Sequence, residues 1–154
     1  MTSADVAAVA ELHRATVLEA YAAIFPPEAP KPTPDDLADR WRRILTRGSA
    51  WVAADPGPVG VVGLIPEEEG GRLESLYVLP SRSGAGVGTR LADTAETEAA
   101  RRGWLPLRLW VLEANEKARI WYESRGWELE PGQGRTVWGG EVDEVGYRFL
   151  GRPA

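Results

Sequence analysis

Apolar residues recur at helical spacing in the first third of the chain and predict two helices. The first helix, over residues 1–25, has an apolar face made of Val6, Val9, Ala10, Val17, Ala20, Tyr21 and Ile24. Thr2 and Asp5 suit a capping box at its start. The stretch 26–34 is rich in proline and is expected to be a loop. A second helix should run from the capping residue Thr33, which precedes a proline and two acids, to about Arg47.

Three short apolar runs follow and predict strands at residues 50–54, 59–65 and 72–79. Residues 67–71, EEEGG, form a turn between the second and third runs. In the third run, the residues of one strand face, Leu73, Ser75 and Tyr77, alternate with those of the other face, Glu74, Leu76 and Val78. The connections are short, so these strands are expected to form an antiparallel meander.

The second half of the chain alternates between helical and strand patterns. We expect a glycine-rich loop at 81–88, a helix over 89–102 ended by Gly103, and a buried strand over 105–112. A helix over 115–125, ended by Gly126, should follow. The last two strands, at 127–130 and 142–150, are expected to be joined by a long glycine-rich loop. The whole order is α-α-β-β-β-α-β-α-β-β. It predicts a single α/β domain over residues 1–154, with one sheet layered with helices.

Composition excludes several kinds of site. The chain of 154 residues has no cysteine, which rules out disulfides, thiolate metal sites and a cysteine nucleophile. Its one histidine, His13, lies on the first expected helix, where a satisfied or exposed residue is the favoured interpretation over a zinc ligand or a member of a catalytic triad. We therefore expect no metal site.

Charge and hydropathy bear on partners and location. The net charge is −5 and the arginines are dispersed, so nucleic-acid binding is not expected and a cationic substrate such as an amine is weakly favoured. No run of about 18 apolar residues is present, and the N-terminus lacks the pattern of a signal peptide. We expect a cytoplasmic protein without a membrane partner.

Gly84, Gly86 and Gly88 alternate between the end of an expected strand and the start of an expected helix. Glycine suits a close approach to a ligand, and free N–H groups at a helix N-terminus bind anions. A Walker loop is excluded because Thr89 and Arg90 follow Gly88. A dinucleotide fingerprint fails because the glycines read GxGxG and no acid follows about 20 residues on. A phosphate or pyrophosphate site and a plain strand-to-helix turn both remain open.

Two runs of residues resemble the signatures of the GNAT superfamily of acetyl-CoA-dependent N-acetyltransferases. VLPSRSGAGVG, from Val78 to Gly88, resembles the family's acetyl-CoA-binding loop, and NEKARIWYESRGW, residues 115–127, resembles its second signature, NxxAxxxYxxxGF. The resemblance covers nearly the whole chain. It implies the GNAT-like acyl-CoA N-acyltransferase fold, with a single mixed, mostly antiparallel sheet flanked by helices. The family's opening strand has no counterpart before the first helix, so the first edge strand is expected to be missing.

The resemblance further implies a site for acetyl-CoA as co-substrate. The pyrophosphate would be held by the loop residues Arg82, Ser83, Gly84, Ala85, Gly86, Val87, Gly88 and Thr89. The backbone of Leu76 and Val78 would pair with the pantetheine arm, and an N–H near Leu76 would stabilise the oxyanion. Asn115 would contact the arm, although a plain helix N-cap is equally compatible. Ser83 stands where the family usually has Gln or Arg, and either Arg82 or Arg90 could supply the missing charge.

Acetyl transfer from a thioester to an amine also requires two proton transfers. Glu74 is the candidate base, because it shares a strand face with Leu76; a solvated strand carboxylate is the alternative. Tyr122 matches the family's tyrosine acid, which protonates the departing thiolate; a packing aromatic beside Trp121 is the alternative. In the family, the regions around Tyr21, Phe25 and Trp138 border the acceptor pocket, where aromatic residues could bind a cation or simply pack.

These observations predict an N-acetyltransferase that transfers an acetyl group from acetyl-CoA to a primary amine of a small molecule or peptide. Without a cysteine nucleophile, direct transfer in a ternary complex is expected. A non-catalytic acyl-CoA-binding or regulatory module is the main alternative, and a nucleotide-phosphate enzyme of another class is a third. The sequence does not identify the acceptor. An exposed strand edge could support a homodimer.

Overall fold

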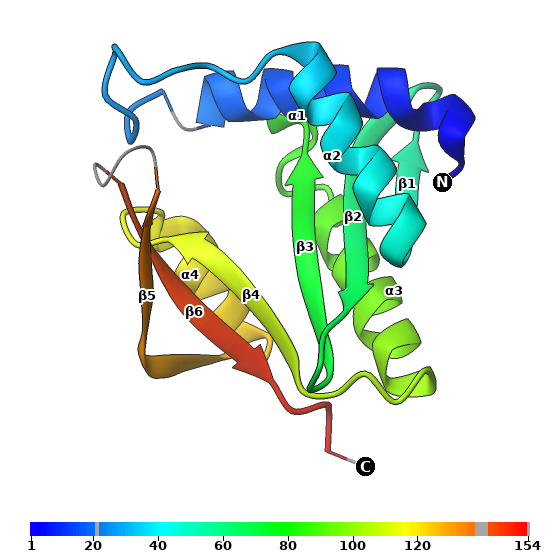
Figure 1. Cartoon of the computed structure of the whole chain (residues 1–154), viewed down its shortest axis with the longest axis vertical. Helices are drawn as coiled ribbons and strands as arrows, with labels where there is room; N and C mark the ends of the chain where they lie inside the picture. The colour runs from blue at the N-terminus through cyan, green and yellow to red at the C-terminus, as the bar shows by residue number, and fades with distance from the viewer. Residues whose placement is uncertain (21, 138–141, 154) are drawn as a thin grey trace.

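The computed structural model describes residues 1–20, 22–137 and 142–153. The chain begins with a 3-10 turn η1 (Ser3–Asp5) and the helices α1 (Val6–Ala20) and α2 (Pro34–Arg47). The strands are β1 (Ser49–Ala54), β2 (Pro58–Pro66), β3 (Gly71–Val78), β4 (Leu107–Leu112), β5 (Glu128–Val137) and β6 (Val142–Phe149). A 3-10 turn η2 (Pro80–Arg82) and helix α3 (Val87–Arg101) separate β3 from β4, and α4 (Glu116–Ser124) separates β4 from β5. The predicted order of helices and strands is confirmed (Figure 1).

The strands form one six-stranded sheet in the order β1-β2-β3-β4-β6-β5. Each neighbouring pair is antiparallel except β3 and β4, which run parallel. The predicted meander of β1, β2 and β3 and the mixed, mostly antiparallel sheet are therefore confirmed. No strand precedes Ser49 in the described residues, so β1 forms one edge of the sheet and β5 forms the other.

β2 separates two hydrophobic cores that lie on opposite faces of the sheet. Val61 and Ile65 belong to the core with α1 and α2, whereas Val62 and Leu64 belong to the core with α3. This division follows from the alternation of side chains along a strand. Figure 1 shows the same layers, with α1 and α2 covering one face and α3 the other. Trp41 is fully buried in the α1–α2 core and so fixes α2 against the sheet.

Helix boundaries follow local capping chemistry. The Thr33 side chain accepts a hydrogen bond from the Asp36 N–H, and the Asp36 carboxylate accepts one from the Thr33 N–H, so α2 begins as predicted. The prediction that the first helix continues to residue 25 is wrong, because α1 ends at Ala20 and residues 22–25 form a turn. Pro26 disfavours helical geometry in the residue before it. Tyr21 lies outside the described residues.

The predicted long loop between the last two strands is partly wrong. Residues 131–137 belong to β5, which pairs with β6 in two stretches separated by a register shift between Leu129 and Gly134. Most side chains of β5 are exposed, so the strand has no alternating pattern that would identify it in the sequence. Residues 138–141, including Trp138, lie outside the described residues.

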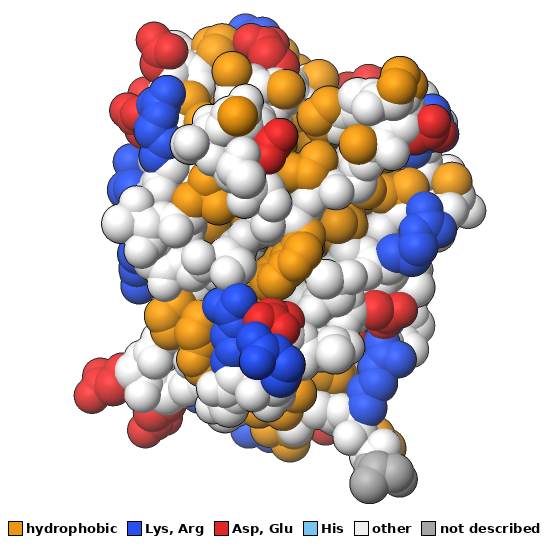
Figure 2. All heavy atoms as spheres, turned by 90° about the vertical axis from the view of Figure 1, so that its right-hand side faces the viewer, with side chains coloured by type: hydrophobic (Ala, Val, Ile, Leu, Met, Phe, Trp, Pro, Cys, Tyr) orange, Lys and Arg blue, Asp and Glu red, His pale blue; other side chains and the backbone are white. Residues whose placement is uncertain are grey.

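The face in Figure 2 shows acidic and basic side chains interspersed around apolar ones, with no continuous basic stripe across this face. Several of the chain's charges form surface pairs, such as Arg101 with Glu98 and Arg148 with Glu128. None of the helices that the structure describes has the length and apolar character needed to cross a membrane.

Candidate active site

The strand β3 has an open edge next to β4. The two strands pair at Gly71 and Arg72, and beyond these residues they diverge (Figure 1). On the other side of β3, the N–H of Leu79 donates a hydrogen bond to β2. Because backbone direction alternates along a strand, the N–H and C=O groups of Leu76 and Val78 point toward the open edge. A ligand that is itself extended and polar could pair with this edge as a further strand would.

A bulge at Glu74 shapes this open edge. Ser75 and Leu73 lie opposite consecutive residues of β2, so Glu74 has no partner there. The Arg40 Nη2 atom donates to the Glu74 carbonyl and to the Ser75 Oγ, each at 3.2 Å. A bulge bends its strand and increases the local twist. The helix α2, through Arg40, therefore holds β3 in its bulged form.

The glycine turn between β3 and α3 has the geometry of an anion site. Gly84 and Gly86 have φ of 81° and 77°, in the left-handed region that favours glycine. Gly86 is the N-cap of α3, so the N–H groups of Val87, Gly88 and Thr89 belong to the first turn and have no partner within the helix. These N–H groups, at the positive end of the helix dipole, suit a phosphate.

Arginines lie on both sides of this turn. Arg82 forms an ion pair with Asp55 at 2.8 Å, so its guanidinium is engaged away from the helix N-terminus. The Arg90 Nη1 atom lies 3.3 Å from the position that a Cβ on Gly86 would occupy. Arg90 is therefore better placed than Arg82 to supply the charge that Ser83 lacks. The Ser83 and Ala85 N–H groups bond within the turn itself.

A cavity of about 450 Å³ opens between α1 and α2 on one side and the diverging strands on the other. Its lining brings together three predicted site residues, Glu74, Leu76 and Tyr122. Val78, Asn115 and the residues of the glycine turn do not line it. Asn115 caps α4, with its Oδ1 atom accepting from the Ala118 N–H at 3.2 Å, which fits the N-cap interpretation and leaves a ligand contact untested.

Tyr122 is held by two tryptophans. Its ring lies edge-on to Trp121 and to Trp127, with centroid distances of 4.9 and 5.7 Å. The side chain is 8 % exposed and lines the cavity. The packing alternative and the catalytic one are thus compatible, because a ring fixed on two sides holds its hydroxyl in a defined direction.

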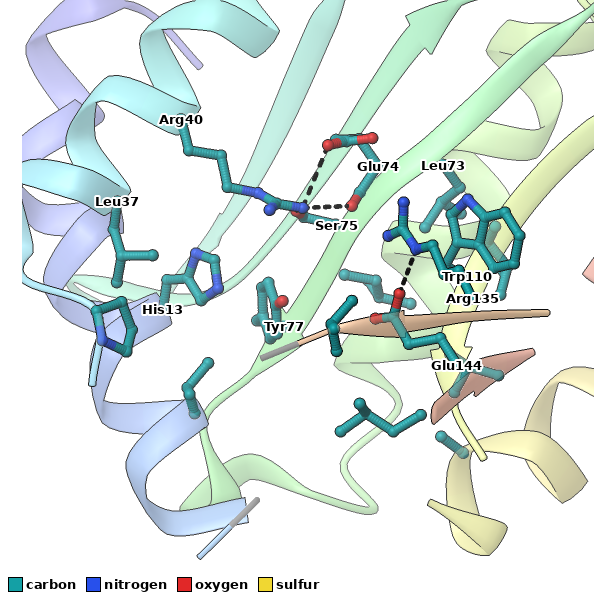
Figure 3. Close-up of a pocket in the computed structure, with 18 of the residues that line it drawn as sticks. His13, Leu37, Arg40, Leu73, Glu74, Ser75, Tyr77, Trp110, Arg135 and Glu144 are labelled. Atoms are coloured by element: carbon teal, nitrogen blue, oxygen red, sulfur yellow. Dashed lines mark hydrogen bonds and ion pairs between the residues drawn. The ribbon is translucent and has the colours of Figure 1, made fainter. Parts of the chain in front are cut away.

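The Glu74 carboxylate is paired with two arginines. It lies 3.2 Å from Arg40 (Figure 3) and 3.9 Å from Arg72. Glu74 is thus not the freely solvated strand carboxylate of the alternative interpretation. An amine that reaches its oxygens must share them with the arginines, or pass its proton through water.

His13 lies in the cavity wall but is poorly suited to accept a proton. Burial, and secondarily the charge of Arg40, lowers the pKa of His13 to about 3. The Trp41 Nε1–H donates to the His13 Nδ1 at 3.2 Å, which occupies the one lone pair of the neutral ring. The imidazole also stacks on Tyr77, with a centroid distance of 3.9 Å. The expectation of a satisfied histidine is confirmed.

Sequence reasoning missed much of the charged lining of this cavity. Arg135 and Glu144 form an ion pair at 2.6 Å on the wall opposite Arg40, and Arg135 lies over the ring of Trp110 (Figure 3). Trp110 itself also lines the cavity. Phe25 lines it as the resemblance implied. Within the described chain, no group of three or more His, Asp or Glu side chains is placed to hold a metal ion.

An α/β sheet with an open strand edge, a glycine turn at a helix N-terminus and a cavity tyrosine defines a class of acyltransferases that use acyl-CoA. The chain belongs to the Acetyltransferase (GNAT) family, which it matches over residues 14–127. It is 30% identical over 124 residues to a probable N-acetyltransferase of Mycobacterium tuberculosis, and this match covers 73% of the chain and 68% of that protein.

Two solved structures share the fold. A GCN5-related N-acetyltransferase from Rhodopseudomonas palustris has a TM-score of 0.80 and 23% identity, covering 97% of this chain and 92% of that one. The PaiA N-acetyltransferase from Thermoplasma acidophilum, in complex with coenzyme A, has a TM-score of 0.74 and 20% identity, covering 97% and 96%. The predicted fold class and family are confirmed.

Proposed function

We propose that this chain transfers an acetyl group from acetyl-CoA to a primary amine of a small molecule or peptide, directly within a ternary complex. The observation that supports it most is the cavity in which Glu74, Leu76 and Tyr122 meet at the open edge of β3. Family membership gives the class of reaction, and this arrangement would supply groups for its steps.

The described residues fit acetyl-CoA, which supplies the activated acetyl group. The free N–H groups of Val87, Gly88 and Thr89, with Arg90 beside them, would hold the pyrophosphate. Leu76 and Val78 would pair with the pantetheine arm through the open edge of β3. The N–H at Leu76 would also donate to the carbonyl oxygen as it gains charge, a contact worth roughly 3 kcal/mol in comparable sites.

Two side chains would move the protons. An amine with a pKa near 10 costs roughly 4 kcal/mol to deprotonate at pH 7, so the reaction needs an acceptor for that proton. Glu74 would take it, directly or through water, while Arg40 and Arg72 fix the carboxylate. Tyr122 would donate its hydroxyl proton to the departing thiolate. The chain has no cysteine to carry the acetyl group in between, which favours direct transfer.

Replacement of Tyr122 by phenylalanine tests this assignment. Phenylalanine keeps the packing against Trp121 and Trp127 and removes the hydroxyl. We expect kcat to fall by about 10²-fold, the low end for loss of a general acid, with little change in acetyl-CoA affinity. The assay is thiol release with a panel of amines. An unchanged kcat would remove Tyr122 from the mechanism.

Tyr147→Phe is a matched control. The Tyr147 hydroxyl is also buried, but it donates to Glu123 at 2.6 Å and does not line the cavity. Its removal should lower thermal stability and leave kcat near the wild-type value. Acetyl-CoA binding without thiol release, for every amine in the panel, would favour the non-catalytic acyl-CoA-binding module instead.

A further inference from the structure

The cavity lining is balanced in charge, although the chain as a whole is acidic. Three acids and three arginines line it: Asp36, Glu74, Glu144, Arg40, Arg43 and Arg135. From this arrangement we infer that the acceptor carries a carboxylate close to the amine that is acetylated, as in an amino acid or a short peptide. This inference rests on the proposed function and names the substrate class of the same site.

Two of the three acids of the cavity are paired with arginines. Glu144 pairs with Arg135 at 2.6 Å, and Glu74 lies between two arginines. The Asp36 carboxylate accepts two hydrogen bonds from Thr33 at the start of α2. Asp36, which is exposed and accepts these bonds through Oδ2 alone, is thus the one acid of the lining not paired with an arginine among the described residues, so a substrate with several ammonium groups would meet three arginines and a single unpaired acid. Such like-charge contacts weaken binding.

The arginines on α2 that line the cavity have N–H donors that no described residue uses. Each Arg40 contact with the bulge uses the same atom, Nη2, so Nη1 has no hydrogen-bond or ion-pair partner in the part of the chain that the structure describes. Arg43 lies three residues further, on the same helix face. It is exposed at the cavity and forms no hydrogen bond or ion pair with a described residue.

The geometry suits an acceptor with two charged ends. Arg40 projects from α2, while the Arg135–Glu144 pair closes the opposite wall (Figure 3). Arg43 lines the same cavity. A carboxylate bound at Arg40 and Arg43 lies on the cavity side of the Glu74 bulge, and its amine extends toward Glu74 and Tyr122. Arginine donors bind carboxylates through strong, charge-assisted hydrogen bonds. The carboxylate therefore orients the amine for attack.

The first experiment compares acceptors that differ in one group. Glycine is tested against glycinamide, phenylalanine against phenylalaninamide, and spermidine serves as the polycation, with kcat/KM measured by thiol release at saturating acetyl-CoA. We expect the carboxylates to exceed their amides by roughly tenfold or more, as for a hydrogen bond to a charged group. The amides have the less basic amines, so intrinsic reactivity does not produce this preference.

The second experiment locates the recognition. In Arg43→Gln, the ratio of kcat/KM for acid over amide should fall about tenfold, mainly through a higher KM for the acid. Arg47→Gln is the matched control, because Arg47 is exposed on the same helix and does not line the cavity. That variant should keep the wild-type ratio.

The outcomes separate the two proposals. Equal or better turnover of the amides or of spermidine would overturn the carboxylate inference and leave the proposed function standing. The same conclusion would follow if Arg43→Gln and Arg47→Gln changed the ratio equally. If no acceptor in the panel released thiol while acetyl-CoA still bound, the proposed function and this inference would both be overturned.

Discussion

Loss of the Arg125 side chain should destabilise the protein far more than loss of an arginine from its surface. Arg125 lies at the end of α4, and its Nη2 atom contacts both oxygens of Glu96 on α3 at 3.0 Å. The Glu96 side chain is 3 % exposed and the Arg125 side chain 9 %. Glu96 also accepts from the Trp127 Nε1–H at 3.1 Å. In Arg125→Ala, a buried carboxylate loses its main counter-charge.

The size of this loss of stability follows from the burial of the ion pair. Removal of one partner of a buried ion pair costs about 3–5 kcal/mol, because the other charge is left uncompensated. Arg152 also contacts Glu96, at 3.1 Å, but its side chain is 59 % exposed and its pairing is screened by water. This remaining partner should keep the loss of stability at about 3 kcal/mol, the lower end of that range. For a domain of this size, that corresponds to a Tm lower by roughly 6–12 °C.

Differential scanning calorimetry of three variants tests the reasoning. Arg101→Ala is the matched control, since Arg101 pairs with Glu98 on the surface and its side chain is 69 % exposed. Because exposed pairs of this kind contribute little to stability, its loss should leave the Tm close to that of the wild type. Glu96→Gln combined with Arg125→Ala should recover part of the stability, because no charge is then left buried. A Tm for Arg125→Ala within a degree or two of that for Arg101→Ala would refute the argument.

Two further predictions concern the glycine turn and the buried histidine. In Gly86→Ala, a residue with a side chain must adopt φ 77°, and its Cβ lies 3.3 Å from Arg90, so the KM for acetyl-CoA should rise several-fold. Gly57→Ala is the control, because a Cβ there meets open space, and it should leave the KM for acetyl-CoA unchanged. The pKa of His13 is about 3 in the folded protein against 6.5 unfolded, so its contribution to stability is full above pH 6.5 and is lost as the pH falls toward 3. His13→Gln should therefore have a Tm that declines less steeply from pH 7 to pH 4, and parallel declines in the two proteins would contradict this.

The element order could be predicted because most elements carry their own signals. The cap at Thr33 and the apolar run of β2 are local features, and the structure keeps both. The strand β5 carries no such signal, since it is an exposed edge whose glycine-rich middle resembles a loop. Its pairing depends on β6, which lies next to it only after the chain has folded.

The candidate site also has one part that the sequence predicts and another that it does not. The glycine turn was readable because left-handed backbone at Gly84 and Gly86 requires a particular residue type. The charged lining of the cavity could not be predicted from the sequence, because Arg40, Arg135 and Glu144 come from three separate elements. Each is an ordinary arginine or glutamate of a solvated surface when taken in the sequence alone. Only the fold shows which of them face one another.

Arg40 contacts both the bulged strand β3 and the proposed base. The parallel pairing of β3 with β4 ends after Arg72, just before the bulge at Glu74. Since Arg40 donates to the bulge carbonyl and also pairs with the Glu74 side chain, one residue of α2 stabilises both the open edge and the proposed base. The bulge and the end of the β3–β4 pairing thus lie within two residues of each other. The edge that would bind the pantetheine arm and the wall that would bind the acceptor are therefore parts of one local structure, which α2 holds in place.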